Sequence, residues 1–151
     1  MMTSSTHDQI VTKTPKKLSR HELPIQSPLS TATIGIIGVG MVGGAVKRYF
    51  EHQKKQIKLF DTHKKFGSKE QVNEADIIFI CVPTPYDETS KGFDLSCLRE
   101  AIMSLKNGKV VVLKSTMLPG TTQAFQEEFP QHSVAYNPEF LTEATADQDM
   151  S

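Results

Sequence analysis

The chain has 151 residues, which is enough for one domain with a substantial core and too few for two large ones. Hydrophobic residues make up 38% and charged residues 23%, a composition typical of a soluble globular protein. Lys and Arg together number 17, as do Asp and Glu, so the formal net charge is zero. This balance gives no electrostatic reason to expect nucleic acid or an acidic membrane as a partner.

The cysteines and histidines do not form a recognisable ligand pattern. Cys81 and Cys97 make no CxxC pair, and the five histidines are scattered. The sequence therefore predicts no metal site. It also predicts no disulfide framework, which favours a reducing compartment such as the cytoplasm. No apolar run approaches the roughly 20 residues of a membrane span, and the N-terminus lacks the apolar segment of a secretory signal.

Residues 1–32 differ in composition from the rest of the chain. They are rich in Ser, Thr, Pro and Lys and show no periodic apolar pattern. We interpret them as a disordered, mildly basic tail. A transit peptide is the alternative, but Asp8, Glu22 and a single arginine argue against it. Residues 33–151 are then expected to form one domain.

From Thr33 onward, short apolar runs alternate with amphipathic segments. Five runs are predicted strands, at 33–39, 57–61, 76–82, 110–114 and 133–136. Helices are predicted at 41–53, from the N-cap Asp94 to a stop at Asn107-Gly108, and at 121–129. Between them, 64–74 is predicted as a short polar connection and 83–93 as a loop.

Strands alternating with helices predict a parallel sheet with helices on both faces. Because crossovers between parallel strands are right-handed, the expected α/β fold is a Rossmann-type doubly wound sheet. In such sheets ligands bind beyond the carboxyl ends of the strands.

A glycine-rich motif follows the first predicted strand and opens the first predicted helix. It fits G-x-G-x-x-G and consists of Gly38, Val39, Gly40, Met41, Val42 and Gly43. The first glycine permits a tight turn, the second lets the backbone approach a pyrophosphate, and the third lets helix and strand pack closely. The motif therefore predicts a dinucleotide site at the N-terminus of this helix.

Asp61 ends the second predicted strand, about 20 residues downstream, as the dinucleotide fingerprint requires. A carboxylate there accepts hydrogen bonds from the ribose hydroxyls and repels the extra phosphate of NADP, so the expected cofactor is NAD. The neighbouring residues weaken this preference for NAD, because basic side chains favour the extra phosphate of NADP. They are His63, Lys64 and Lys65. A glycine turn used only for packing, with Asp61 as a cap, is the alternative interpretation.

Polar clusters follow three successive strands. They are VPTP at 82–85, STMLPGTT at 115–122 and NPEFLTE at 137–143. One such cluster would be explained by turn chemistry alone. Three in succession, all at carboxyl ends of parallel strands, predict a site near the nicotinamide end of the cofactor.

The chain from about Thr33 to Met150 resembles the N-terminal domain of the UDP-glucose/GDP-mannose dehydrogenase family, most closely its members that act on UDP-glucose. The resemblance rests on GVGMVG (38–43), Asp61, VPTP (82–85), STMLPGTT (115–122) and NPEFLTEATADQD (137–149). It implies oxidation of a nucleotide sugar at C6 to a carboxylate, as from UDP-glucose to UDP-glucuronate, with two NAD reduced and a cysteine nucleophile holding the intermediate.

The resemblance also implies roles for individual residues. Besides the glycine motif, the cofactor contacts would be Asp61, Pro83, Thr84, Thr116 and Glu143. Thr116, Glu139 and Glu143 would be catalytic, with Thr116 orienting a water or the sugar hydroxyl and Glu139 carrying a proton. The sugar site would be lined by Glu139, Phe140, Leu141, Thr142 and Glu143.

The family chain continues past residue 151, so the domain is expected to be incomplete at its C-terminus. The continuation holds the active-site lysine, asparagine and cysteine, and a connecting helix through which a homodimer forms. Cys81 and Cys97 are interpreted as core and packing residues and do not replace that cysteine. The chain alone is then expected to bind NAD without completing the oxidation. Two alternatives remain: an inactive NAD-binding module, and a Rossmann dehydrogenase of the β-hydroxyacid type.

Overall fold

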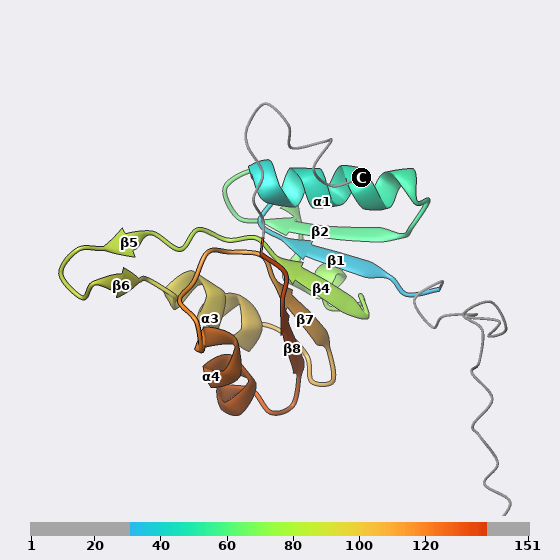
Figure 1. Ribbon diagram of the computed structural model, residues 1–151. Coiled ribbons are helices and arrows are strands. Elements are labelled where there is room, and N and C mark those ends of the chain that lie inside the picture. The colour runs from blue at the N-terminus through green and yellow to red at the C-terminus, as the bar shows by residue number, and fades with distance from the viewer. Residues whose placement is uncertain (1–30, 139–151) are drawn as a thin grey trace, which may run out of the picture.

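The structure, a computed structural model, describes residues 31–138. Six strands form one sheet in the order β3-β2-β1-β4-β7-β8, and every pair is parallel apart from the edge strand β3 (Figure 1). The strands are β1 (Ile34–Ile37), β2 (Ile57–Asp61), β3 (Phe66–Gly67), β4 (Ile77–Ile80), β7 (Val110–Leu113) and β8 (Ser133–Tyr136). The Rossmann-type doubly wound fold predicted from the sequence is confirmed.

Four helices cover the sheet, and a small hairpin extends from its carboxyl edge. The helices are α1 (Met41–His52), α2 (Lys69–Val72), α3 (Ser96–Met103) and α4 (Thr121–Glu128). The hairpin consists of β5 (Tyr86–Asp87) and β6 (Gly92–Phe93), and projects away from the body of the domain (Figure 1). None of the helices within residues 31–138 is long and apolar enough to cross a membrane.

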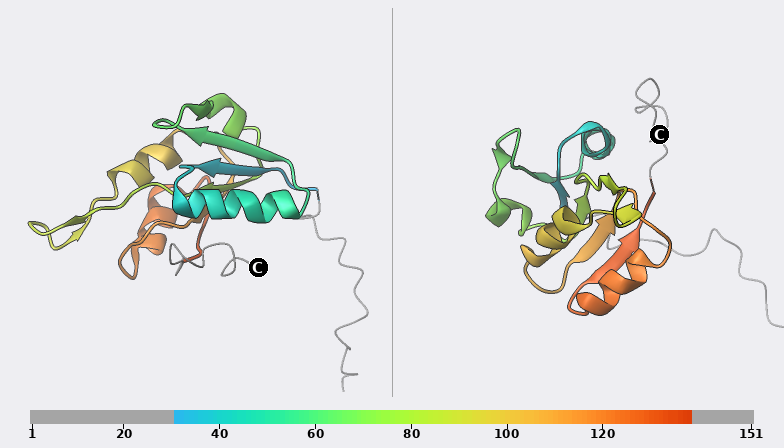
Figure 2. Two further views of the ribbon diagram at one scale, coloured as in Figure 1. Left: turned by 90° about the horizontal axis from the view of Figure 1, so that it is seen from above. Right: turned by 90° about the vertical axis from the view of Figure 1, so that its left-hand side faces the viewer.

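The two faces of the sheet are covered differently. On one face, β1, β4 and β7 pack against α2, α3 and α4 in a cluster that includes Ile78, Leu98 and Phe125. On the other face α1 packs over β1 and β2, through Val46 against Ile36. Figure 2 shows this division, with α1 on one side of the sheet and α3 and α4 on the other. Alternate side chains of β1, β2 and β4 enter one cluster or the other, as the pleat requires.

Two predicted connections contain more structure than expected. The segment 64–74 was predicted as a polar connection, but it forms β3 and α2, and Val72 is fully buried. The physical reason lies in Gly35, where an added Cβ would come 2.9 Å from Cγ2 of Val72. A glycine in β1 thus makes room for this valine. The segment 83–93, predicted as a loop, contains the β5–β6 hairpin.

The start of α3 lies one residue later than predicted. Leu95 occupies the N-cap position, not Asp94, and its side chain makes no capping hydrogen bond. Asp94 still serves the helix start, because its Oδ1 accepts a hydrogen bond from the backbone N–H of Ser96 at 2.9 Å. The carboxylate therefore caps from just outside the helix.

The strand order reverses between β1 and β4. From β1 the chain moves outward to β2, and it then returns past β1 to β4, β7 and β8. Loops leaving the carboxyl ends of β1 and β4 consequently diverge to opposite sides, which opens a crevice between them. The glycine motif leaves β1 at this point.

Candidate cofactor site

The three glycines of the loop between β1 and α1 meet three different surroundings. Gly38 has a φ of +86°, and an added Cβ would lie 2.6 Å from the carbonyl oxygen of Cys81. At Gly43 an added Cβ would lie 1.9 Å from the carbonyl oxygen of Gly38, whereas at Gly40 nothing lies within 4 Å. The first and third glycines are therefore required by the fold, and the second faces open space. This is the arrangement that a pyrophosphate needs to approach the backbone.

The N-terminus of α1 is electrostatically prepared for an anion. Its N-cap is Gly40, which makes no side-chain capping bond, and the first turn holds no acidic residue. The first N–H groups of a helix lack partners within the helix, and they carry the positive end of its dipole. Together with the open space at Gly40, this N-terminus fits the phosphates of NAD.

Asp61, at the end of β2, is tied to the glycine loop. Its Oδ2 accepts a hydrogen bond from the N–H of Val39 at 2.6 Å, and its Oδ1 accepts one from the N–H of Lys64 at 2.8 Å. Partial burial raises the pKa of Asp61, but backbone hydrogen bonds from Lys64, Val39 and His63 and the charge of Lys64 outweigh burial and hold it below its ordinary value. Asp61 is therefore an ionised acceptor at neutral pH.

Lys64 makes a second connection to the same loop. Its Nζ donates a hydrogen bond to the carbonyl oxygen of Val39 at 2.6 Å. The backbone N–H of Val39 is thus hydrogen-bonded to Asp61, and its C=O to Lys64. Sequence reasoning treated Lys64 only as a positive charge near the carboxylate and did not predict that it holds the glycine loop.

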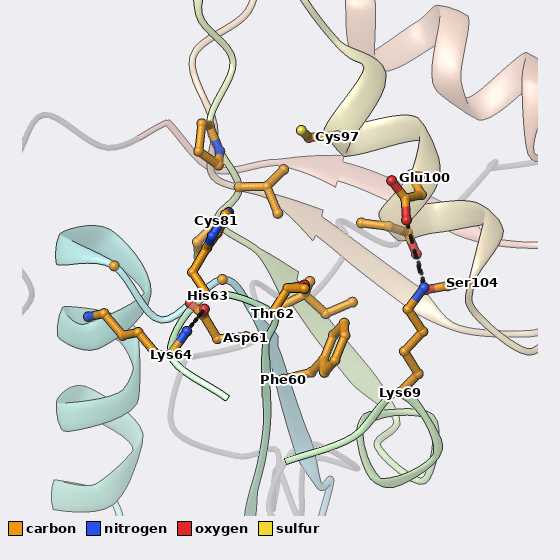
Figure 3. Close-up of a pocket in the computed structure, with 16 residues that line it drawn as sticks. Phe60, Asp61, Thr62, His63, Lys64, Lys69, Cys81, Cys97, Glu100 and Ser104 are labelled. Carbon is orange, nitrogen blue, oxygen red and sulfur yellow. Dashed lines mark hydrogen bonds and ion pairs between the residues drawn. The ribbon is translucent and has the colours of Figure 1, made fainter. Parts of the chain in front are cut away.

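A pocket of about 340 Å³ lies beside this loop, across the reversal point of the sheet. It is lined by Gly38 and Gly40 from the loop, by Asp61 after β2, and by Val82 and Pro83 after β4. Figure 3 shows Asp61, His63 and Lys64 at one end of this pocket. The pocket lies beyond the carboxyl ends of the strands, where sheets of this topology bind dinucleotides.

The far wall of the pocket comes from α3, which sequence reasoning did not assign to the site. Its lining residues are Cys97, Glu100 and Ala101, together with Ser104 at the C-cap of the helix. They are spaced three and four residues apart and so lie on one helical face, a pattern that was available in the sequence. Cys97 was predicted to be a packing residue, but it is exposed and lines the pocket. Cys81 is half-buried and packs against the α1 side of the sheet.

The polar clusters after β4 and β7 are hydrogen-bonded to each other. Thr84 Oγ1 donates to the carbonyl oxygen of Thr116 at 2.6 Å, and Ser115 Oγ donates to that of Val82 at 2.5 Å. Thr84 and Thr116, predicted from separate motifs, are therefore brought together. Neither lines the pocket, which ends at Pro83.

The end of β7 is also linked to the end of β8. Lys114 is only 5% exposed, and its Nζ donates to Oδ1 of Asn137 at 2.7 Å. This link holds the start of the third polar cluster. The remaining predicted residues of that cluster, Glu139, Phe140, Leu141, Thr142 and Glu143, lie outside the described residues. Within residues 31–138, no group of three His, Cys, Asp or Glu side chains is placed to hold a metal ion.

The reversal of strand order, the glycine loop and Asp61 define a dinucleotide-binding domain. Residues 63–151 match the NAD-binding domain of the UDP-glucose/GDP-mannose dehydrogenase family. The match covers more than half of the chain, so the chain belongs to this family and its cofactor is NAD.

Curated relatives with several substrates align with the chain. UDP-glucose 6-dehydrogenase from Campylobacter jejuni is 33% identical over 87 residues, which are 56% of this chain and 22% of that enzyme. UDP-N-acetyl-D-mannosamine dehydrogenase from Methanococcus aeolicus is 34% identical over 82 residues, 47% of this chain and 19% of that enzyme. The chain thus spans about a fifth of the length of these relatives.

Solved structures share the fold. The UDP-glucose dehydrogenase from Pyrobaculum islandicum superposes with a TM-score of 0.65 at 23% identity, over 89% of this chain and 40% of that one. GDP-mannose dehydrogenase from Pseudomonas aeruginosa superposes with a TM-score of 0.64 at 23% identity, over 77% of this chain and 38% of that one. At this identity the similarity establishes the fold and leaves the sugar open.

Proposed function

We propose that this chain supplies the NAD-binding part of an enzyme that oxidises UDP-glucose to UDP-glucuronate. The proposal rests on the pocket that joins the glycine loop to the ionised carboxylate of Asp61. Similarity to UDP-glucose 6-dehydrogenases supports the choice of sugar, although UDP-N-acetyl-D-mannosamine dehydrogenases are similarly close. We place the activity in the cytoplasm and expect the full-length form to be a homodimer.

The described residues divide the binding task along the cofactor. The N-terminus of α1 binds the pyrophosphate at Gly40, and Asp61 accepts hydrogen bonds from the adenosine ribose. Pro83 and Thr84 line the path toward the nicotinamide, which accepts a hydride from the sugar carbon when NAD is bound. We expect Val42 and Met41, which begin α1, to contact the cofactor from the side of the helix.

Thr116 is the described residue proposed for catalysis. Its backbone is held by Thr84, and its side chain is exposed at the carboxyl end of β7. A threonine fixed in this way can orient a water or the sugar hydroxyl without moving itself. Glu139 is proposed as the proton carrier and Glu143 as a contact of the catalytic water and nicotinamide. Residues 139–143 together are proposed to line the sugar site.

The sugar is tested by calorimetric titration of the chain, saturated with NAD, with UDP-glucose, UDP-N-acetylmannosamine and GDP-mannose. The proposal expects the tightest binding for UDP-glucose. Tighter binding of UDP-N-acetylmannosamine or GDP-mannose would contradict UDP-glucose as the substrate, but it would still agree with a nucleotide-sugar dehydrogenase. No binding of NAD at all would contradict the proposed function itself.

A second candidate function is NAD binding without turnover. It needs only the cofactor site, which the described residues form from the glycine loop and Asp61. Incubation of the full-length form with NAD and UDP-glucose distinguishes the two, because only an enzyme that completes the reaction accumulates NADH steadily. A β-hydroxyacid-type enzyme receives no such support, since the likeness to 3-hydroxyisobutyrate dehydrogenase, with a TM-score of 0.53 at 17% identity, concerns the fold alone.

A further inference from the structure

The pocket has a second end that the glycine loop and Asp61 do not explain. Its walls there come from β2, α2 and α3, and include Phe60, Lys69, Glu100, Ala101 and Ser104. In Figure 3, Lys69 and Glu100 reach toward each other from opposite sides of this end. Since the glycine loop meets the pyrophosphate and Asp61 meets the ribose, the base of the dinucleotide belongs beyond Asp61, at this end.

The chemistry of these walls suits a flat base with polar edges. Phe60 and Ala101 offer apolar surfaces, while Lys69 and Glu100 supply one donor group and one acceptor group. The Nζ of Lys69 lies 3.7 Å from Oε1 of Glu100 and 5.9 Å from the centre of the Phe60 ring. Ser104 Oγ donates to the carbonyl oxygen of Ala101, so toward a ligand it can only accept.

The ion pair between Lys69 and Glu100 contributes little to the fold. The two side chains are 47% and 80% exposed, and solvent screens such pairs strongly. A separation of 3.7 Å is also too long for a hydrogen bond, so the carboxylate keeps its capacity to accept one from a ligand. Both charged groups therefore remain accessible to a ligand at the mouth of the pocket.

We propose that Glu100 recognises the exocyclic amino group of the adenine of the bound dinucleotide, with Lys69 as a residue that positions the carboxylate. The inference rests on the proposed NAD site. Adenine presents an N–H₂ donor at this edge, which a carboxylate can accept. Hypoxanthine presents an oxygen at the same position, and two acceptors repel. The site should then bind NAD more tightly than nicotinamide hypoxanthine dinucleotide.

The test is calorimetric titration of the whole chain with these two dinucleotides. We expect the wild type to prefer NAD, and Glu100→Gln to reduce this preference about three- to tenfold, because a glutamine amide can turn either its oxygen or its N–H₂ toward the base. Glu127→Gln, on the exposed side of α4, is the matched control and should keep the preference. Lys69→Met should lower the preference partly, and Lys69→Arg should restore it.

The outcomes separate the inference from the function on which it rests. If Glu100→Gln binds NAD and keeps the wild-type preference, Glu100 does not recognise the base and the inference is wrong. A wild type that binds both dinucleotides equally contradicts it as well, while leaving the NAD site intact. Failure of the wild type to bind either dinucleotide refutes the proposed function and the inference together.

Discussion

Replacing Gly40 by alanine should separate cofactor binding from folding. An added Cβ at this position meets nothing within 4 Å, and the φ of −78° is accessible to alanine. The fold should therefore tolerate the change, and loss of glycine's freedom in the unfolded chain is even expected to stabilise it by about 0.4–1 kcal/mol. The glycine loop and the start of α1 would keep their shape.

The same methyl group should interfere with NAD. It extends about 1.5 Å beyond Cα, into the space where a phosphate oxygen would accept an N–H from the helix terminus at about 2.9 Å. Each hydrogen bond to a charged group contributes about 1.5–3 kcal/mol. The loss of one such bond would weaken NAD binding roughly 10- to 150-fold.

Calorimetric titration with NAD, paired with thermal unfolding, measures both effects in one protein. Gly43→Ala is the contrasting variant, because its Cβ would lie 1.9 Å from the carbonyl oxygen of Gly38 and should lower the unfolding temperature. If Gly40→Ala bound NAD with wild-type affinity at an unfolding temperature no lower than that of the wild type, the glycine loop would not be the phosphate site. The assignment of the cofactor site would then have to be abandoned.

Three further predictions concern charges. Asp61→Asn should weaken NAD about tenfold or more and narrow its advantage over NADP, measured by titration with both; an unchanged preference would remove Asp61 from the ribose site. Burial and then the charge of Lys109 lower the pKa of His132 below its ordinary value of 6.5. The contribution of the neutral His132 to the free energy of unfolding should therefore be complete above about pH 6.5 and diminish as the pH falls below it. Urea unfolding at a series of pH values measures this dependence, and His132→Asn should make it weaker. Asn137→Ala should lower the free energy of unfolding by about 1–3 kcal/mol, since the buried Lys114 loses an acceptor, whereas Asn137→Asp should not.

The sheet was predictable because its signal is local. Runs such as Ile57–Asp61 and Ser133–Tyr136 form strands with the predicted bounds. The structure of the connection from β2 to β4 could not be predicted, because α2 is a single turn that adds only Val72 to the core. That residue is buried only because Gly35, in a strand distant in sequence, leaves room for it.

The candidate site was predictable in part for the same reason. The glycine motif and Asp61 are local signals of backbone shape and charge, and the structure brings them together through the bond from Val39 N–H to Asp61. Lys64 was not predicted to hold the loop, because its partner is the carbonyl oxygen of Val39, 25 residues away. A backbone acceptor has no signature in the sequence.

The return of the chain past β1 has two consequences that belong together. It separates the loops after β1 and β4, which opens the pocket at the carboxyl edge. It also places α2, α3 and α4 on one face, so that among residues 31–138 only α1 packs on the other. Val110 is 41% exposed as a result, while its neighbour Val111 is fully buried. Among residues 31–138, the topology that creates the binding crevice thus also leaves the Val110 face of β7 without the double cover that parallel strands usually have.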